Sequence, residues 1–182
     1  MHSALGMLEI SSIPKGIETG DEMLKAADVA LVAAHPVCAG KYIVVIVGEV
    51  AAVRYAVDAG QRVSGMKLVD KLVIPNIDPQ VPAAINMCND AGTVGAIASM
   101  ELFSLCACVL AADAAVKAAE VRLIEVRLAR GLGGKGFITL TGEVADVESA
   151  IRAAGALEEV QGLVSESVVI PSPHPEIINS LL

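Results

Sequence analysis

The sequence predicts an α/β (α+β) chain of two tandem ferredoxin-like domains, each in the order strand, helix, strand, strand, helix, strand. First, one set of motifs occurs twice in the same order. Second, short β-branched apolar runs alternate with segments of helical apolar spacing. Third, 54% of the 182 residues are hydrophobic but only 2% are aromatic. Such small aliphatic side chains give each domain a modest core, so we expect burial to be completed at subunit interfaces.

The internal repeat is carried by three pairs of matching segments. In chain order they are Asp21–Val29 with Asp113–Val121, Gly48–Val50 with Gly142–Val144, and Leu72–Pro75 with Val168–Pro171. The distance between the members of a pair grows by two residues at each step, which two short loop insertions explain. Chance similarity between alanine-rich helices would not keep this order along the whole chain. We therefore place the two domains at residues 1–90 and 91–182.

The first half contains each of the six expected elements. Leu5–Ile10 is a short apolar run and predicts the first strand. Ser12 and Pro14 indicate a helix start, with a hydroxyl cap and a proline in the first turn. The residues expected on one face of this helix are Ile17, Leu24 and Ala27. The remaining elements are strands at Val29–Ala33 and Tyr42–Val47, a helix with Val50, Val53, Val57 and Gly60 at helical spacing, and a strand at Lys71–Ile74.

The second half repeats this order. The predicted elements are a strand at Ser99–Leu102, a helix at Ser104–Ala119, strands at Val121–Val126 and Gly136–Leu140, a helix at Val144–Ala154 and a strand at Ser167–Ile170. The order predicts an antiparallel sheet covered by two helices in each domain. Many unrelated proteins share such a fold, so the fold alone does not specify a function.

Composition and motifs exclude several classes of protein. The net charge of −8 argues against nucleic acid as a partner. Charged residues interrupt the apolar stretches before the roughly 20 residues of a membrane span, and the start lacks a signal-peptide pattern. The four cysteines form no Cys-x-x-Cys pair and are expected as reduced thiols of a cytoplasmic protein. No paired carboxylates, Ser/His/Asp set or metal triad emerges at workable spacing, so we do not expect an enzyme.

Several motifs carry a family resemblance. They are the Asp-x-Met-x-Lys-Ala-Ala segment at Asp21–Ala27, the glycine-rich Gly131–Lys135, the Gly-Glu-Val before the second helix of each half, and the closing Val-Ile-Pro. With these motifs the chain resembles the bacterial microcompartment (BMC) shell domain, in the tandem form with unpermuted strand order. The resemblance implies a structural homotrimer, a pseudo-hexameric tile with six domains around one central pore. Such tiles pack with other microcompartment shell proteins into a sheet that encloses metabolic enzymes in the cytoplasm.

The resemblance also implies that the loops before Lys41 and Lys135 line the pore. The expected pore-lining residues are Cys38, Ala39 and Gly40 in the first loop and Gly131, Leu132, Gly133 and Gly134 in the second. Three chains around a threefold axis bring three copies of Cys38 together. Three thiolates suffice to hold one [4Fe-4S] cluster per trimer through three of its irons. The implied role is electron or cluster transfer across the shell, with encapsulated redox enzymes as partners.

Two other functions remain open from the residues. In one, Cys38 is only a small pore-lining side chain, and the empty pore conducts small polar or anionic metabolites past the backbone amides of Gly131–Gly136. In the other, the tandem domains form a small-molecule-sensing regulator, which predicts a monomer or dimer without sheet assembly. Nucleotide binding is not expected, because Gly136 follows Lys135 where a P-loop has Ser or Thr.

The remaining candidate residues are two lysines, three cysteines and a histidine. Lys25 and Lys117 either solvate their helices or, as the resemblance implies, lie at tile edges against a neighbour's lysine. The other cysteines are expected in the core, with Cys88 a structural residue near the linker. Cys106 and Cys108 lie about 200° apart around a helix, so they cannot share a metal. His35 is expected on a solvated loop.

Overall fold

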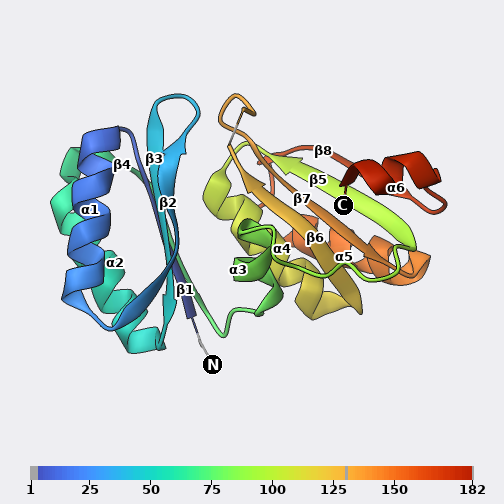
Figure 1. The fold of residues 1–182 in the computed structure, drawn as a ribbon, viewed down its shortest axis with the longest axis horizontal. Coiled ribbons are helices and arrows are strands. Elements are labelled where there is room, and N and C mark those ends of the chain that lie inside the picture. Colours follow the sequence, from blue (N-terminus) through green and yellow to red (C-terminus); the bar gives the residue numbers. More distant parts are fainter. Residues whose placement is uncertain (1–3, 130, 182) are drawn as a thin grey trace. The chain divides into compact units, whose positions relative to one another are not determined.

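The computed structural model describes residues 4–129 and 131–181, which form two compact units. One unit is Met1–Pro82 together with Ala129–Gly134, and the other is Ala83–Leu128 together with Lys135–Leu182. Each unit contains a four-stranded antiparallel sheet and two long helices on one face of that sheet (Figure 1).

The first sheet has the order β2-β3-β1-β4. Its strands are β1 (Ala4–Ile10), β2 (Val29–Val37), β3 (Lys41–Gly48) and β4 (Leu68–Pro75). Strand β1 lies between β3 and β4, and its register with β3 runs from Ala4 opposite Gly48 to Ile10 opposite Tyr42. The helices are α1 (Ile13–Ala26) and α2 (Val50–Ser64), and a short 3-10 turn, η1 (Gly65–Lys67), leads into β4.

The second sheet repeats this topology in the order β6-β7-β5-β8. Its strands are β5 (Ala96–Leu102), β6 (Val121–Leu128), β7 (Gly136–Gly142) and β8 (Val164–Ile170), and its helices are α4 (Leu105–Ala118) and α5 (Val144–Ala156). The prediction of two βαββαβ units in tandem is therefore confirmed.

Two short helices were not predicted from the sequence. Helix α3 (Gln80–Ile85) and helix α6 (Pro175–Leu181) each follow the Val-Ile-Pro segment that closes a sheet. With six and seven residues they are too short to show the repeated apolar spacing that identifies a longer helix.

The apolar face predicted for α1 is wrong in two of its three residues. Ile17 is 57% exposed and Leu24 39% exposed, whereas Ala27 packs partly against the core. The residues of α1 that are buried are Gly16, Thr19, Gly20 and Met23. A Cβ at Gly16 would collide with the Tyr42 side chain, so this part of the helix packs closely on the sheet and Ile17 lies outside.

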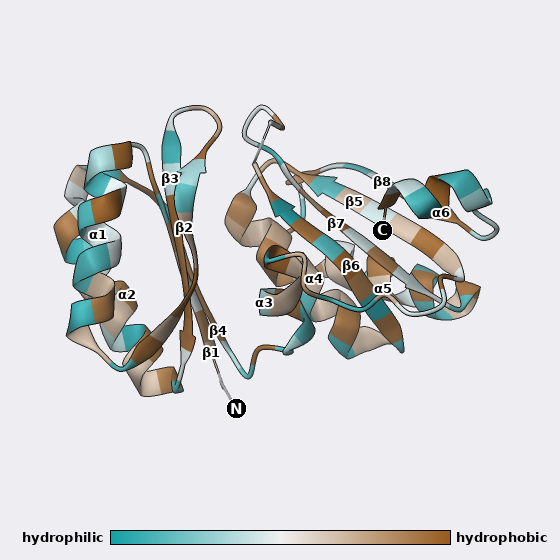
Figure 2. Ribbon diagram, viewed as in Figure 1, coloured by the Kyte–Doolittle hydropathy of each residue, from teal (hydrophilic) through white to brown (hydrophobic). Residues whose placement is uncertain are grey.

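The core of the first unit forms where α2 meets β1 and β3. Val53 and Val57 are buried as predicted, and a Cβ at Gly60 would lie 2.6 Å from Leu8 Cδ1. Aliphatic residues of β1 and β3 dominate this core, and Figure 2 shows the strands of the first sheet as largely hydrophobic. The structure thus explains how a chain with so few aromatic residues closes its core: glycine and alanine let the helix approach the sheet.

Candidate functional site

The first predicted pore loop is the tip of the β2–β3 hairpin. Strand β2 ends at Val37 and β3 begins at Lys41, so Cys38, Ala39 and Gly40 form the turn between them. Gly40 has a φ of +74°, which only glycine adopts without strain, and no atom lies within 4 Å of its missing Cβ. Ala39 and Gly40 are exposed and Cys38 is partly exposed. The hairpin therefore presents the cysteine on a short turn bordered by open space.

The second predicted pore loop belongs to the same compact unit. Its three glycines, Gly131, Gly133 and Gly134, have φ values of +75°, +61° and +94°. No atom lies within 4 Å of the missing Cβ at Gly131 or Gly133. These positions are therefore glycine because of their backbone conformation.

The two loops meet at Cys38. The Cys38 amide donates a hydrogen bond of 3.0 Å to the Ala129 carbonyl oxygen. Hydrogen bonds from backbone amides, that of Gly131 first and then those of Leu132 and Gly133, lower the pKa of the Cys38 thiol, although burial acts in the opposite direction. Successive amides of this kind form an anion-binding concavity. The structure thus brings Cys38 together with three of the predicted residues of the second loop.

This environment fits an iron-ligating cysteine. The thiolate is the form that binds metal, and a lowered pKa favours it. Hydrogen bonds to sulfur are also among the features that tune iron–sulfur clusters. Within a single chain, no three His, Cys, Asp or Glu side chains of residues 4–129 and 131–181 are grouped as a metal site.

Two ion pairs, which sequence reasoning missed, hold the ends of the loops. Lys41, the first residue after the first loop, pairs with Glu9 of β1, whose side chain is 3% exposed. Lys135, the first residue after the second loop, pairs with Glu101 of β5 at 2.6 Å. Lys135, followed by Ser165, lowers the pKa of Glu101. The signal was present in the sequence, because each half carries Glu on its first strand and Lys directly after its loop.

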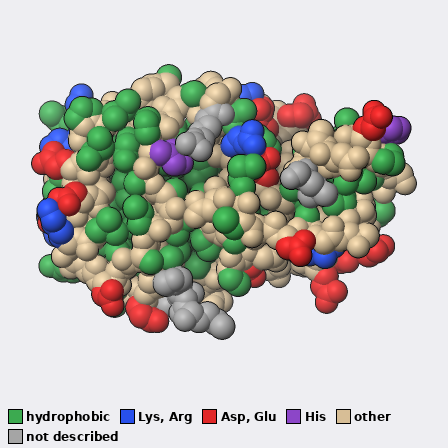
Figure 3. All heavy atoms as spheres, in the orientation of Figure 1, with side chains coloured by type: hydrophobic (Ala, Val, Ile, Leu, Met, Phe, Trp, Pro, Cys, Tyr) green, Lys and Arg blue, Asp and Glu red, His purple; other side chains and the backbone are tan. Residues whose placement is uncertain are grey.

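The two candidate tile-edge lysines occupy matching places on α1 and α4. Lys25 pairs with Asp21, and Lys117 pairs with Asp113 at 2.5 Å, each across one helical turn. The Lys25 side chain is 69% exposed, and its hydrogen bond to Asp21 raises its pKa. In Figure 3, acidic and basic side chains gather over the helices of the first unit, beside hydrophobic ones.

The remaining candidates fall outside the loops. Cys106 and Cys108 are buried on α4, as predicted, and burial raises the pKa of the Cys108 thiol. The prediction that Cys88 belongs to the core is wrong, because it is exposed. His35 is half-buried on strand β2 and not on a solvated loop, because β2 extends to Val37, four residues beyond its predicted end.

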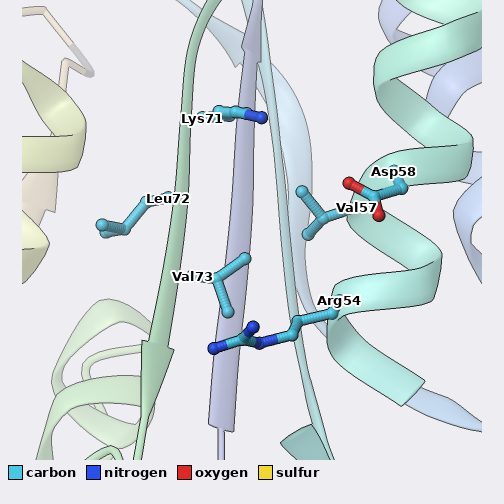
Figure 4. A pocket seen from close by; sticks show the side chains of 6 residues that line it. All are labelled: Arg54, Val57, Asp58, Lys71, Leu72 and Val73. Atoms are coloured by element: carbon cyan, nitrogen blue, oxygen red, sulfur yellow. The ribbon is translucent and has the colours of Figure 1, made fainter. Parts of the chain in front are cut away.

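Away from the loops, the first unit has a pocket of about 310 Å³ between α2 and β4 (Figure 4). It is lined by Arg54, Val57, Asp58, Lys71, Leu72 and Val73. The Lys71 ammonium is already bound to Gln61 Oε1 at 2.8 Å. The pocket carries none of the predicted site residues. In the described part of the chain, no helix is long and apolar enough to cross a membrane.

Comparison with known proteins identifies the repeated unit. The family model described as "BMC domain" matches twice, at residues 4–77 and 96–173. The chain is 42% identical over 174 residues to the bacterial microcompartment shell protein PduT of Citrobacter freundii, covering 96% of this chain and 95% of that protein. It is 30% identical to the carboxysome assembly protein CcmO of Synechococcus elongatus, covering 98% of this chain and 68% of that protein.

A solved structure is similar over nearly the whole chain. It is a microcompartment protein from Desulfitobacterium hafniense, 44% identical in sequence, with a TM-score of 0.94. The similarity covers 98% of this chain and 99% of that one. The tandem arrangement of the two units is thus shared with a known microcompartment protein.

Proposed function

Because the chain belongs to the BMC domain family, we propose that it assembles as a homotrimeric tile whose six domains surround one central pore. The chain is a structural shell protein of a bacterial microcompartment and not an enzyme, and it forms part of that shell in the cytoplasm. The tandem domains are therefore interpreted as those of a shell protein, and not as those of a small-molecule-sensing regulator.

An apolar stripe on α1 supports assembly of several copies. Ile13, Ile17 and Leu24 are 37%, 57% and 39% exposed, and their spacing puts them on one side of the helix. In the repeat, Leu105 and Val109 of α4 occupy the places of Ile13 and Ile17 and are fully buried. The aliphatic side chains on α1 are thus exposed at positions where the second domain buries its own. This favours an interface in which another copy of the chain covers them.

The pore is proposed to be lined by Cys38, Ala39 and Gly40 with Gly131–Gly134, and Cys38 is the proposed iron ligand. The observation that supports this most strongly is that the second loop lies against the Cys38 turn, where the Cys38 amide donates to the Ala129 carbonyl oxygen. Backbone amides of residues 131–133 also lower the pKa of the Cys38 thiol, which favours the thiolate. Cys38 from each of three chains would hold one [4Fe-4S] cluster, and such a cluster supplies one-electron transfer when it is bound. The tile would then pass electrons or a cluster across the shell to encapsulated redox enzymes.

The experiment is anaerobic purification followed by iron and acid-labile sulfide assays and a visible spectrum. We expect about four irons and four sulfides per three chains, with broad absorption in the visible range. Lack of iron and sulfide after anaerobic reconstitution would instead favour the second candidate, an empty pore that conducts metabolites. The open space beside Gly131 and Gly133 favours that candidate, because no atom fills the place that a Cβ would occupy at either position.

Edge-to-edge packing of tiles with other shell proteins is proposed to use Lys25 and Lys117. The support is that both lysines recur at the same place of the repeat, near the last turns of α1 and α4. Their Asp partners fix each lysine along its helix and leave the stem available to a neighbour.

A further inference from the structure

Lys41 makes an ion pair that reaches into the first sheet. It is the first residue of β3, directly after the hairpin turn, and its ammonium pairs with Glu9 of the central strand β1. The Glu9 side chain is 3% exposed and that of Lys41 is 24% exposed. Among the described residues, the buried Oε1 atom of Glu9 has no hydrogen-bond partner besides this ion pair. A carboxylate so far from water requires the ammonium to stay in place.

The same ammonium borders the second loop. A Cβ added at Gly134 would lie 4.0 Å from Lys41 Nζ and 3.9 Å from the Cys38 carbonyl oxygen. At the other end of that loop, Ala129 accepts the hydrogen bond of 3.0 Å from the Cys38 amide. The loop 129–134 is thus adjacent to the Cys38–Lys41 segment at both of its ends, with the amides of residues 131–133 between them.

We propose that Lys41 is a positioning residue for both loops: Glu9 fixes its ammonium, and the ammonium fixes Gly134 against the Cys38 turn. The loop is then held at Ala129 by a backbone hydrogen bond and at Gly134 by the buried ion pair. This rests on the proposed function only in naming these segments pore loops. The orientation of the backbone amides of residues 131–133 in the pore then depends on Lys41, whose side chain points toward the sheet.

The corresponding lysine of the second half provides a matched control. Lys135 also follows a loop and also pairs with Glu on the first strand of its sheet. Its partner Glu101 is more exposed, at 32%, and has a second hydrogen-bond partner in Ser165. Removing Lys135 therefore leaves no deeply buried charge, and because Lys135 follows the same loop 129–134, the control is read at the Cys38 amide.

The test is amide hydrogen exchange of the full-length assembled protein, read at Cys38 and at residues 131–133. We expect Lys41→Met to speed exchange of these amides by about tenfold or more. Lys41→Arg keeps the cation and should restore protection. Lys135→Met should leave the Cys38 amide at its wild-type rate.

A double variant keeps the test decisive if Lys41→Met alone fails to fold. Glu9→Gln with Lys41→Met removes both charges, so no carboxylate is buried unpaired, and the loops should still exchange faster. Wild-type exchange at residues 131–133 in either variant would overturn the proposal, as would Lys41→Arg behaving like Lys41→Met. Light scattering on the same samples shows whether each variant has the same assembly as the wild type, so faster exchange in an unchanged assembly is due to the loops themselves.

Discussion

The ammonium of Lys41 is paired with the carboxylate of Glu9, and Lys41 directly follows the hairpin turn that carries Cys38. The repeat reproduces this relationship as Lys135 with Glu101, at the base of the glycine-rich loop. The two pairs differ in burial, with Glu9 at 3% exposure and Glu101 at 32%. Two equivalent interactions in different solvent exposure therefore allow each to serve as a control for the other.

Lys41→Met should destabilise the protein far more than Lys135→Met. Removal of Lys41 leaves the Glu9 carboxylate buried without its partner, which costs about 3–5 kcal/mol in comparable cases. Glu101 keeps water and Ser165 when Lys135 is removed, so the loss there should be clearly smaller. Unfolding in denaturant measures both changes. Equal losses for the two variants would contradict the burial difference.

The pKa of Glu101 should report its pair with Lys135. Lys135, and after it Ser165, lower this pKa in the folded protein. A folded pKa below the unfolded one means that the stabilisation is present above the unfolded pKa and is lost as the pH falls through the folded pKa. An NMR titration of the Glu101 carboxyl should therefore give a low midpoint, and Lys135→Met should raise it. A midpoint that stays unchanged in the variant would refute the assignment.

Much of the fold could be predicted from the sequence, because the repeat supplies each element twice. Apolar spacing located the buried residues of α2, yet it failed for α1, where Gly16 and Gly20 approach the sheet and Ile17 points outward. A prediction from hydrophobicity alone places large apolar side chains in the core. It does not account for a helix backbone that packs close to the sheet through glycine. The short helices α3 and α6 could not be predicted, because they are too short to show repeated apolar spacing.

The candidate site was predictable in part. The resemblance singled out Cys38 and the glycines of the second loop, and the structure brings three of those loop residues to the thiol. The ion pair of Lys41 with Glu9 was missed, because their pairing depends on the register of β1 with β3. A comparison of the two halves for recurring opposite charges would have found it.

Changing Lys25 and Lys117 to Ala should abolish two-dimensional sheets and leave the trimer intact. Both lysines are proposed to contact neighbouring tiles, whereas in the described part of the chain each pairs with an Asp across its own helix turn. Lys15→Ala is the control, since Lys15 pairs with Glu18 on the same helix at 2.6 Å. Electron microscopy shows whether sheets form. If the double variant forms sheets as the wild type does, the assignment of these lysines to the tile edge is wrong.

Gly133→Leu should narrow the pore without unfolding the domain. The backbone at Gly133 has a φ of +61°, which costs a leucine roughly 1–2 kcal/mol, but open space surrounds the missing side chain. Gly16→Leu is the contrasting variant, because the Tyr42 side chain occupies the space beside it. Thermal unfolding should show a small loss for the first and a large one for the second. The reverse order would make Gly133 a structural turn and Gly16 a replaceable residue.

The most direct test of a trimer with Cys38 at its axis is native mass spectrometry of anaerobically reconstituted protein. The wild type should give the mass of three chains plus one [4Fe-4S] cluster, and Cys38→Ser should give three chains without it, because a hydroxyl is a poor iron ligand. Cys88→Ser changes an exposed cysteine and should keep both the trimer and the cluster. A wild type with the mass of a single chain, or a Cys38→Ser trimer that retains the cluster, would contradict the account.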